Sequence, residues 1–109
     1  MQGIINDNLA ALAKICEIYN VSRLYVFGSV VTERFSPKES DLDFLVEMQP
    51  MQVVERGENL IRLWDALENL FQKKVDLITD QAIKNPFFKA ELDKTKLLIY
   101  DRTKQEIPV

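Results

Sequence analysis

The chain has 109 residues, 47% of them hydrophobic, and a formal net charge of −3. This length and apolar content predict one domain over residues 1–109 and exclude a largely disordered chain. The negative charge argues against broad, nonspecific nucleic-acid binding, for which a basic face is expected. The single cysteine, Cys16, excludes a disulfide framework and a cysteine-ligated zinc cluster.

Histidine is absent from the sequence. Its absence excludes Ser-His-Asp and Cys-His catalysis, zinc held by histidine and acid–base catalysis by an imidazole. An enzyme of this composition must use carboxylates and lysines, and carboxylates favour hard cations such as Mg²⁺ or Mn²⁺. No apolar run approaches the roughly 20 residues of a membrane-spanning helix. The first residues also lack the pattern of a signal peptide, so we expect no membrane association and a cytoplasmic location.

Hydrophobic periodicity predicts a chain that alternates between helices and strands. The elements expected first are a helix over 6–19, a strand over 21–27, a short helix over 30–35, a turn over 36–40 and a strand over 41–48. They are followed by a long amphipathic helix over 52–72, a strand over 74–78 and a helix that begins at Pro86. Residues 97–100 either return to the sheet or pack as a tail, and residues 101–109 are expected to be a solvated tail or a partner contact.

Several side chains have an expected place in the packing. Cys16 lies on an apolar stripe and is expected to fill the core rather than to react. Gly57 is expected to allow close packing of its helix on the sheet. Trp64 is expected in the core because its spacing matches the apolar stripe of that helix. Phe87 and Phe88 are expected on the apolar side of the helix that begins at Pro86.

Polar residues cluster where the first strand ends and the second begins. The first strand ends in Gly28-Ser29, and the second begins with Asp41-Leu42-Asp43. Because residues two apart on a strand point to the same face, the two carboxylates can converge on a divalent cation. Gly28 lets the backbone approach a ligand closely, and Ser29 at the start of a helix suits phosphate. The pattern therefore predicts a metal-dependent phosphate site.

A third acid, Asp76, lies among aliphatic residues of the third strand, where a charge is costly unless it is paired or metal-bound. Taken singly, these acids have other interpretations: Asp76 as a capping or surface acid, and Ser40 with Asp41 as a turn cap. The glycines are too scattered for a P-loop or a dinucleotide-binding motif. The segment that begins at Asp41 also lacks the glycine and the glutamate of an EF-hand loop.

Three stretches together resemble the minimal nucleotidyltransferases of the polymerase-beta superfamily. They are Phe27-Gly28-Ser29, residues 40–46 and residues 75–78. The resemblance covers nearly the whole chain. It implies an α+β, polymerase-beta-like nucleotidyltransferase fold, with helices packed mainly on one side of a small mixed β-sheet.

The resemblance also implies roles for individual residues. Gly28-Ser29 would hold phosphates of ATP or another nucleoside triphosphate, and Lys74 is the best candidate to neutralise them. Asp41 and Asp43 would bind two Mg²⁺ ions, for which Mn²⁺ could substitute. Asp76 would complete one metal site and orient or deprotonate the attacking hydroxyl.

The activity that the resemblance implies is transfer of a nucleoside monophosphate, AMP from ATP being expected, to a hydroxyl. Members of this family are often antitoxins of helical HEPN-domain ribonuclease toxins, so a HEPN-domain partner is expected to carry that hydroxyl. Val31 and Glu33 stand where many members have a small residue and a glycine. They support an alternative, a non-catalytic module that neutralises its partner by contact. A nucleotide-binding subunit of a small-molecule nucleotidyltransferase is a third interpretation, and a homo-oligomer also stays open.

Overall fold

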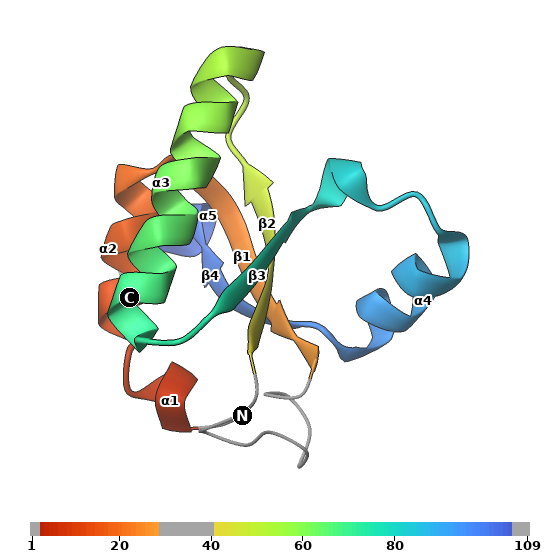
Figure 1. Cartoon of the computed structure of the whole chain (residues 1–109), viewed down its shortest axis with the longest axis horizontal. Helices are drawn as coiled ribbons and strands as arrows, with labels where there is room; N and C mark the ends of the chain where they lie inside the picture. The colour runs from red at the N-terminus through yellow and green to blue at the C-terminus, as the bar shows by residue number, and fades with distance from the viewer. Residues whose placement is uncertain (1–2, 29–40, 106–109) are drawn as a thin grey trace.

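A four-stranded mixed sheet is the centre of the computed structural model, which describes residues 3–28 and 41–105 (Figure 1). The strands of this sheet follow the order β3-β2-β1-β4. The described elements are α1 (Gly3–Asn6), α2 (Leu9–Ile18), β1 (Val21–Phe27), β2 (Leu42–Met48), α3 (Val53–Phe71), β3 (Val75–Thr79), η2 (Asp80–Ala82), α4 (Pro86–Thr95), β4 (Leu97–Asp101) and α5 (Arg102–Gln105).

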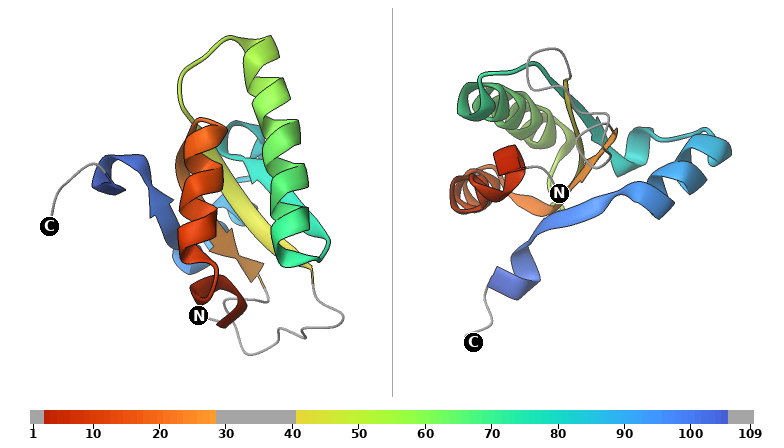
Figure 2. Two further views of the ribbon diagram at one scale, coloured as in Figure 1. Left: turned by 90° about the vertical axis from the view of Figure 1, so that its left-hand side faces the viewer. Right: turned by 90° about the horizontal axis from the view of Figure 1, so that it is seen from below.

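Strand β1 pairs antiparallel with both β2 and β4, and β2 pairs parallel with β3. A parallel pair needs a long crossover connection, and α3 supplies it between β2 and β3. Helices α2 and α3 lie side by side against one face of the sheet, whereas α4 lies on the other side (Figure 2). The expected α+β fold, with a mixed sheet and helices mainly on one side, is confirmed.

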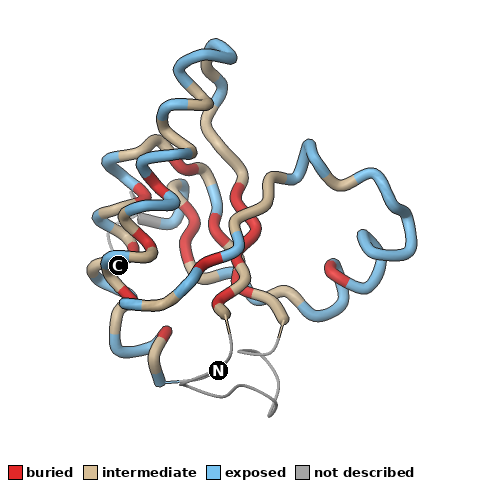
Figure 3. Tube along the Cα trace, viewed as in Figure 1, coloured by how far each residue is buried: buried red, intermediate tan, exposed pale blue. Residues whose placement is uncertain are grey.

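The hydrophobic core fills the space between the sheet and the two long helices (Figure 3). Val26, Phe44 and Val46 are fully buried on this face of the sheet, and the ring of Phe44 stacks on that of Phe71, with centroids 5.9 Å apart. Cys16 lies in the same core, as predicted. Burial raises the pKa of its thiol to about 12, so the reactive thiolate is scarce at neutral pH.

Most expected elements agree with the structure to within a few residues. The first helix is interrupted, because the side chain of Asn8 donates a hydrogen bond to the carbonyl of Ile4 and separates α1 from α2. Residues 97–100 return to the sheet as part of β4, which decides between the two alternatives for that segment. The short helix expected over 30–35 and the turn over 36–40 lie outside the described residues.

Two expectations for α3 are wrong. Trp64 is 40% exposed at the edge of the core, where its ring nitrogen donates a hydrogen bond to the carbonyl of Val75 at 2.7 Å. Gly57 faces open space, since a Cβ at that position would meet nothing within 4 Å. The apolar surface of α3 is wider than the part that packs on the sheet. Leu63 and Leu67 are buried, whereas the side of the helix that carries Trp64 stays exposed.

The sequence predicts a solvated tail or a partner contact over 101–109, and the described part of that segment, residues 101–105, is attached to the rest of the chain instead of being a free tail. Asp101 is buried, and its carboxylate accepts hydrogen bonds from the backbone and hydroxyl of Thr103. Arg102 donates from Nε to the carbonyl of Val21 at 3.0 Å, and from Nη2 to the carbonyl of Cys16 and the next carbonyl along the chain, each at 3.3 Å. The last carbonyls of α2 thereby gain a cationic partner.

No helix in the described part of the chain is both long and apolar enough to cross a membrane.

Replacing Arg102 tests whether the start of α5 holds α2 in place. We expect Arg102→Ala to lower the free energy of unfolding by about 1–2 kcal/mol, because carbonyls at the end of α2 lose a charged donor. Urea unfolding measures this change. Lys104→Ala, at an exposed position of the same helix, should stay within about 0.5 kcal/mol of the wild type. Equal effects of the two substitutions would contradict this role.

Candidate active site on the second face of the sheet

One row of residues crosses three strands on the face opposite the core. Phe27 of β1 is the register partner of Asp43 of β2, and Asp43 is the partner of Asp76 of β3. Their neighbours Val26 and Phe44 are buried on the core face, so alternation places this row on the second face. Cross-strand partners have Cβ atoms about 5 Å apart. The pairing therefore brings two aspartates together, although the sequence separates them by a long helix.

The two aspartates interact unfavourably. The pKa of Asp43 is raised to about 6, first by desolvation of its partly buried carboxyl and then by the charge of Asp76 and a hydrogen bond with it. Asp41 raises it further. Among the described residues, every cause resolved for this group raises its pKa. Close carboxylates with a raised pKa are characteristic of functional sites.

Gly28 lies directly against this cluster. Its φ of +77° is readily available only to glycine, and a Cβ at this position would overlap Oδ2 of Asp43. The backbone at the end of β1 therefore approaches the carboxylate more closely than any other residue type would allow. Ser29, expected to bind phosphate together with Gly28, lies outside the described residues, as do Val31 and Glu33.

Asp41 lies just before β2, where the neighbouring backbone N–H of Leu42 donates to the carbonyl of Lys74 at 3.1 Å. Asp41 is close enough to Asp43 to affect its pKa. Among the residues that the structure describes, however, no three acidic side chains are gathered into a metal-binding group. Asp43 and Asp76 are thus the close pair, and Asp41 stands at its margin.

Lys74, the expected phosphate-neutralising residue, is exposed and lies beside α3. It lines an open pocket of about 320 Å³ together with Trp64, Asp65 and Glu68, among others. No hydrogen bond or ion pair described for the chain joins Lys74 to Asp43 or Asp76. Its approach to a bound phosphate is a prediction rather than a feature of this structure.

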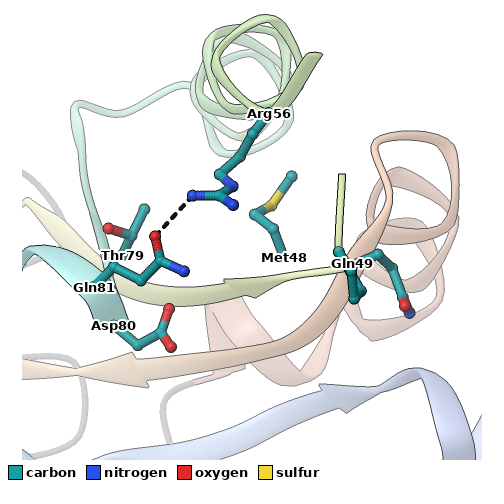
Figure 4. Close-up of a pocket in the computed structure, with 7 residues that line it drawn as sticks. Met48, Gln49, Arg56, Thr79, Asp80 and Gln81 are labelled. Carbon is teal, nitrogen blue, oxygen red and sulfur yellow. Dashed lines mark hydrogen bonds between the residues drawn. The ribbon is translucent and has the colours of Figure 1, made fainter. Parts of the chain in front are cut away.

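A separate cavity of about 240 Å³ lies at the opposite, carboxyl-terminal ends of β2 and β3 (Figure 4). Its lining residues are Met48, Gln49, Pro50, Arg56, Thr79, Asp80 and Gln81. Arg56 donates a hydrogen bond to the side-chain oxygen of Gln81 at 2.7 Å across this cavity. Asp80 is the one acid among the described residues that line this cavity, so they do not supply the paired carboxylates that a two-metal site uses.

The donor set at the aspartate pair fits a hard divalent cation. Carboxylate oxygens are the ligands that Mg²⁺ and Mn²⁺ favour. A cation between Asp43 and Asp76 would also remove the repulsion that raises the pKa of Asp43.

The family model described as Nucleotidyltransferase domain matches residues 10–100 of the chain. The chain belongs to the nucleotidyltransferase family. Two relatives from Methanocaldococcus jannaschii carry the name "putative protein adenylyltransferase". One is 33% identical over 84 residues, or 76% of this chain and 81% of the relative. The other is 37% identical over 99 residues, or 88% of this chain and 93% of the relative.

Solved structures agree with this assignment. A "putative minimal nucleotidyltransferase" superposes with a TM-score of 0.69 at 25% identity, over 84% of this nucleotidyltransferase and 89% of that chain. A toxin–antitoxin complex with AMP-PNP gives a TM-score of 0.65 at 17% identity, over 90% and 77%. An MNT antitoxin structure, in complex with a tri-AMPylated HEPN toxin of Shewanella oneidensis, gives 0.56 at 16% identity, over 94% and 76%. The two complexes show a shared fold, and the resemblance stated from the sequence is confirmed.

Neutralising Asp43 should stabilise the protein at neutral pH. The folded-state pKa is raised, so ionisation of Asp43 weakens the fold as pH rises through about 6. We expect Asp43→Asn to gain about 1 kcal/mol at pH 7.5, a value reduced for solvent screening. Urea unfolding should show that this gain shrinks as pH falls through about 6 and vanishes below about pH 3, where the wild-type carboxyl is protonated in both states.

Asp93→Asn is the matched control for this titration. Hydrogen bonds from Lys89 and Lys96 lower the pKa of Asp93. The ionised form of Asp93 therefore stabilises the fold at every pH above the usual pKa of an aspartate. The control should therefore be no more stable than the wild type at pH 7.5. An Asp43→Asn variant that is also no more stable at this pH would contradict the repulsion at the site.

Two glycine substitutions with opposite expected signs test the close approach at Gly28. Gly28→Ala should lose about 1–2 kcal/mol from the left-handed backbone alone, with a further loss from overlap with Asp43. Gly57→Ala should gain about 1 kcal/mol, because its Cβ meets open space on a helix. Thermal unfolding of the two variants measures both effects. If Gly28→Ala unfolds at the same temperature as the wild type, the backbone at this position does not need the left-handed conformation.

Proposed function

We propose that residues 1–109 form one nucleotidyltransferase domain that moves AMP from ATP to a hydroxyl, using Mg²⁺ or Mn²⁺. The observation that carries this proposal is the close pair of Asp43 and Asp76 beside the backbone of Gly28. A carboxylate pair of this kind suits cations that neutralise a triphosphate, and the glycine lets a phosphate come close. Family membership supports the reaction class.

In the proposed reaction, the acceptor oxygen forms a bond to the α-phosphorus, the bond to the β-phosphate oxygen breaks, and pyrophosphate leaves. Two ions held by Asp41, Asp43 and Asp76 would neutralise the triphosphate and lower the pKa of the acceptor hydroxyl. Asp76, exposed at the β3 side of the pair, orients the hydroxyl and accepts its proton. Gly28-Ser29 and Lys74 bind the phosphates that leave.

The proposed acceptor is a hydroxyl of a protein partner. The relatives named as protein adenylyltransferases support a protein substrate. The solved complex that contains an AMPylated HEPN toxin and an MNT antitoxin supports a HEPN-type partner. We therefore propose that the chain is an antitoxin that modifies its toxin, and that it acts in the cytoplasm, where ATP and such a partner occur.

Transfer of label from α-labelled ATP to a co-expressed HEPN-type partner tests this function. We expect Asp43→Ala and Asp76→Asn each to lower the labelling rate at least about 100-fold, because each removes a ligand for a cation. EDTA should abolish labelling by the wild type. Asp80→Ala, which alters a carboxylate in the separate cavity, should label at close to the wild-type rate.

Two outcomes would count against this proposal. Equal labelling by the wild type and Asp43→Ala would remove the aspartate pair from the reaction. Neutralisation of the toxin by Asp43→Ala without any labelling would favour the alternative, a module that acts by contact alone.

A further inference from the structure

Two aromatic side chains of α4 are exposed beside the candidate active site. Phe87 is 85% exposed and Phe88 is 45% exposed. Their exposure is not informative by itself, because single apolar side chains are common on protein surfaces. Their place is informative, because α4 lies on the side of the sheet opposite α2 and α3 (Figure 2). Strand register and alternation put the aspartate pair on that same side.

Helix α4 has several attachments that fix its position. At its start, the side chain of Asn85 accepts hydrogen bonds from the backbone N–H groups of Phe87 and Phe88 at 2.9 and 3.3 Å. One turn after Phe88, Leu92 is buried, although it lies outside the main core cluster. After the last turn, Lys96 places its Nζ 4.4 Å from the centre of the Tyr25 ring. The backbone that carries Phe88 is therefore held at both ends of the helix.

Phe88 is connected to the aspartate pair through one residue. Its ring meets that of Phe27 edge-on, with centroids 6.4 Å apart and an interplanar angle of 72°. Phe27 is the cross-strand partner of Asp43 and immediately precedes Gly28. The aromatic pair thus lies on the β1 side of Asp43, whereas Asp76 lies on the β3 side. The proposed acceptor hydroxyl would approach from the β3 side.

A nucleobase fits this place better than an aliphatic ligand does. The base of a nucleotide is one sugar away from the α-phosphate, which must lie at the carboxylates for transfer to occur. A ring one side chain away from Asp43 is therefore within reach of the base. Aromatic stacking contributes about 1–3 kcal/mol per base and tolerates any base, because every base has a flat face.

We propose that Phe88, positioned by Phe27, stacks on the base of the bound nucleotide and supplies the base-dependent part of its affinity. This proposal rests on the proposed function, because it needs the triphosphate to bind at Asp43 and Asp76. It adds a base-binding surface contributed by α4, whereas the carboxylates and Gly28 would serve the phosphates and their cations.

Calorimetric titration with two probes separates the base from the phosphates. The probes are AMP-PNP and inorganic tripolyphosphate, each with excess MgCl₂. We expect Phe88→Leu to weaken AMP-PNP binding about 5- to 100-fold and to leave tripolyphosphate binding unchanged. Phe88→Trp should restore AMP-PNP binding. Phe87→Leu, the matched control on the same helical turn, should change neither affinity by more than about twofold.

Other results would overturn the proposal in distinguishable ways. Unchanged AMP-PNP binding by Phe88→Leu would remove the ring from the base site and leave the proposed function intact. Equal weakening of both probes would show that α4 only supports the phosphate site. Unchanged AMP-PNP binding with reduced labelling of the partner would assign Phe88 to protein docking. Failure of the wild type to bind either probe would instead contradict the proposed function itself.

Discussion

The parallel pairing of β2 with β3 is the constraint on which the candidate site depends. It places Asp43 beside Asp76 although α3 separates them in the chain. The arrangement is unfavourable for the isolated protein, because the neighbouring charge and partial burial raise the pKa of Asp43. Keeping two carboxylates in contact lowers the free energy of unfolding, as the residues of functional sites often do. A bound cation would turn this repulsion into attraction.

The remaining elements divide their tasks between the two faces of the sheet. On one face, α2 and α3 bury the aliphatic and aromatic core that keeps the strands in register. On the other face, the same strands present the acids, and α4 packs beside them. Gly28 connects the core to the site, because it directly follows β1 and its backbone lies against Asp43. Loss of register would therefore disrupt the site and the core together, because the same strands carry both.

The sequence predicts those parts of the structure that local patterns determine. The strands β1 and β2 follow from runs of apolar residues. The shared face expected for Asp41 and Asp43 stays a prediction, because Asp41 lies just before β2. Burial of Cys16 follows from its helical stripe. Asp76 is singled out because a charge among aliphatic residues needs a partner. Its pairing with Asp43 becomes evident only once the parallel register is known.

Other features depend on contacts between distant segments and leave no local signal. The apolar arc of α3 does not indicate which of its flanks faces the sheet, so Gly57 and Trp64 are misplaced by periodicity alone. Arg102 belongs to a charged segment that resembles a tail until the end of α2 lies next to it. The contact of Phe88 with Phe27 likewise depends on the return of α4 across the sheet.

The most direct test of this account is a carbon NMR titration of the Asp43 carboxyl, with and without Mg²⁺. Without the cation, the account predicts a midpoint near pH 6, reflecting partial burial and the neighbouring charge of Asp76. With millimolar Mg²⁺, the midpoint should fall to the usual aspartate range or below it, because the cation favours the ionised form. A midpoint that Mg²⁺ does not move would contradict the claim that this pair is built to hold a cation.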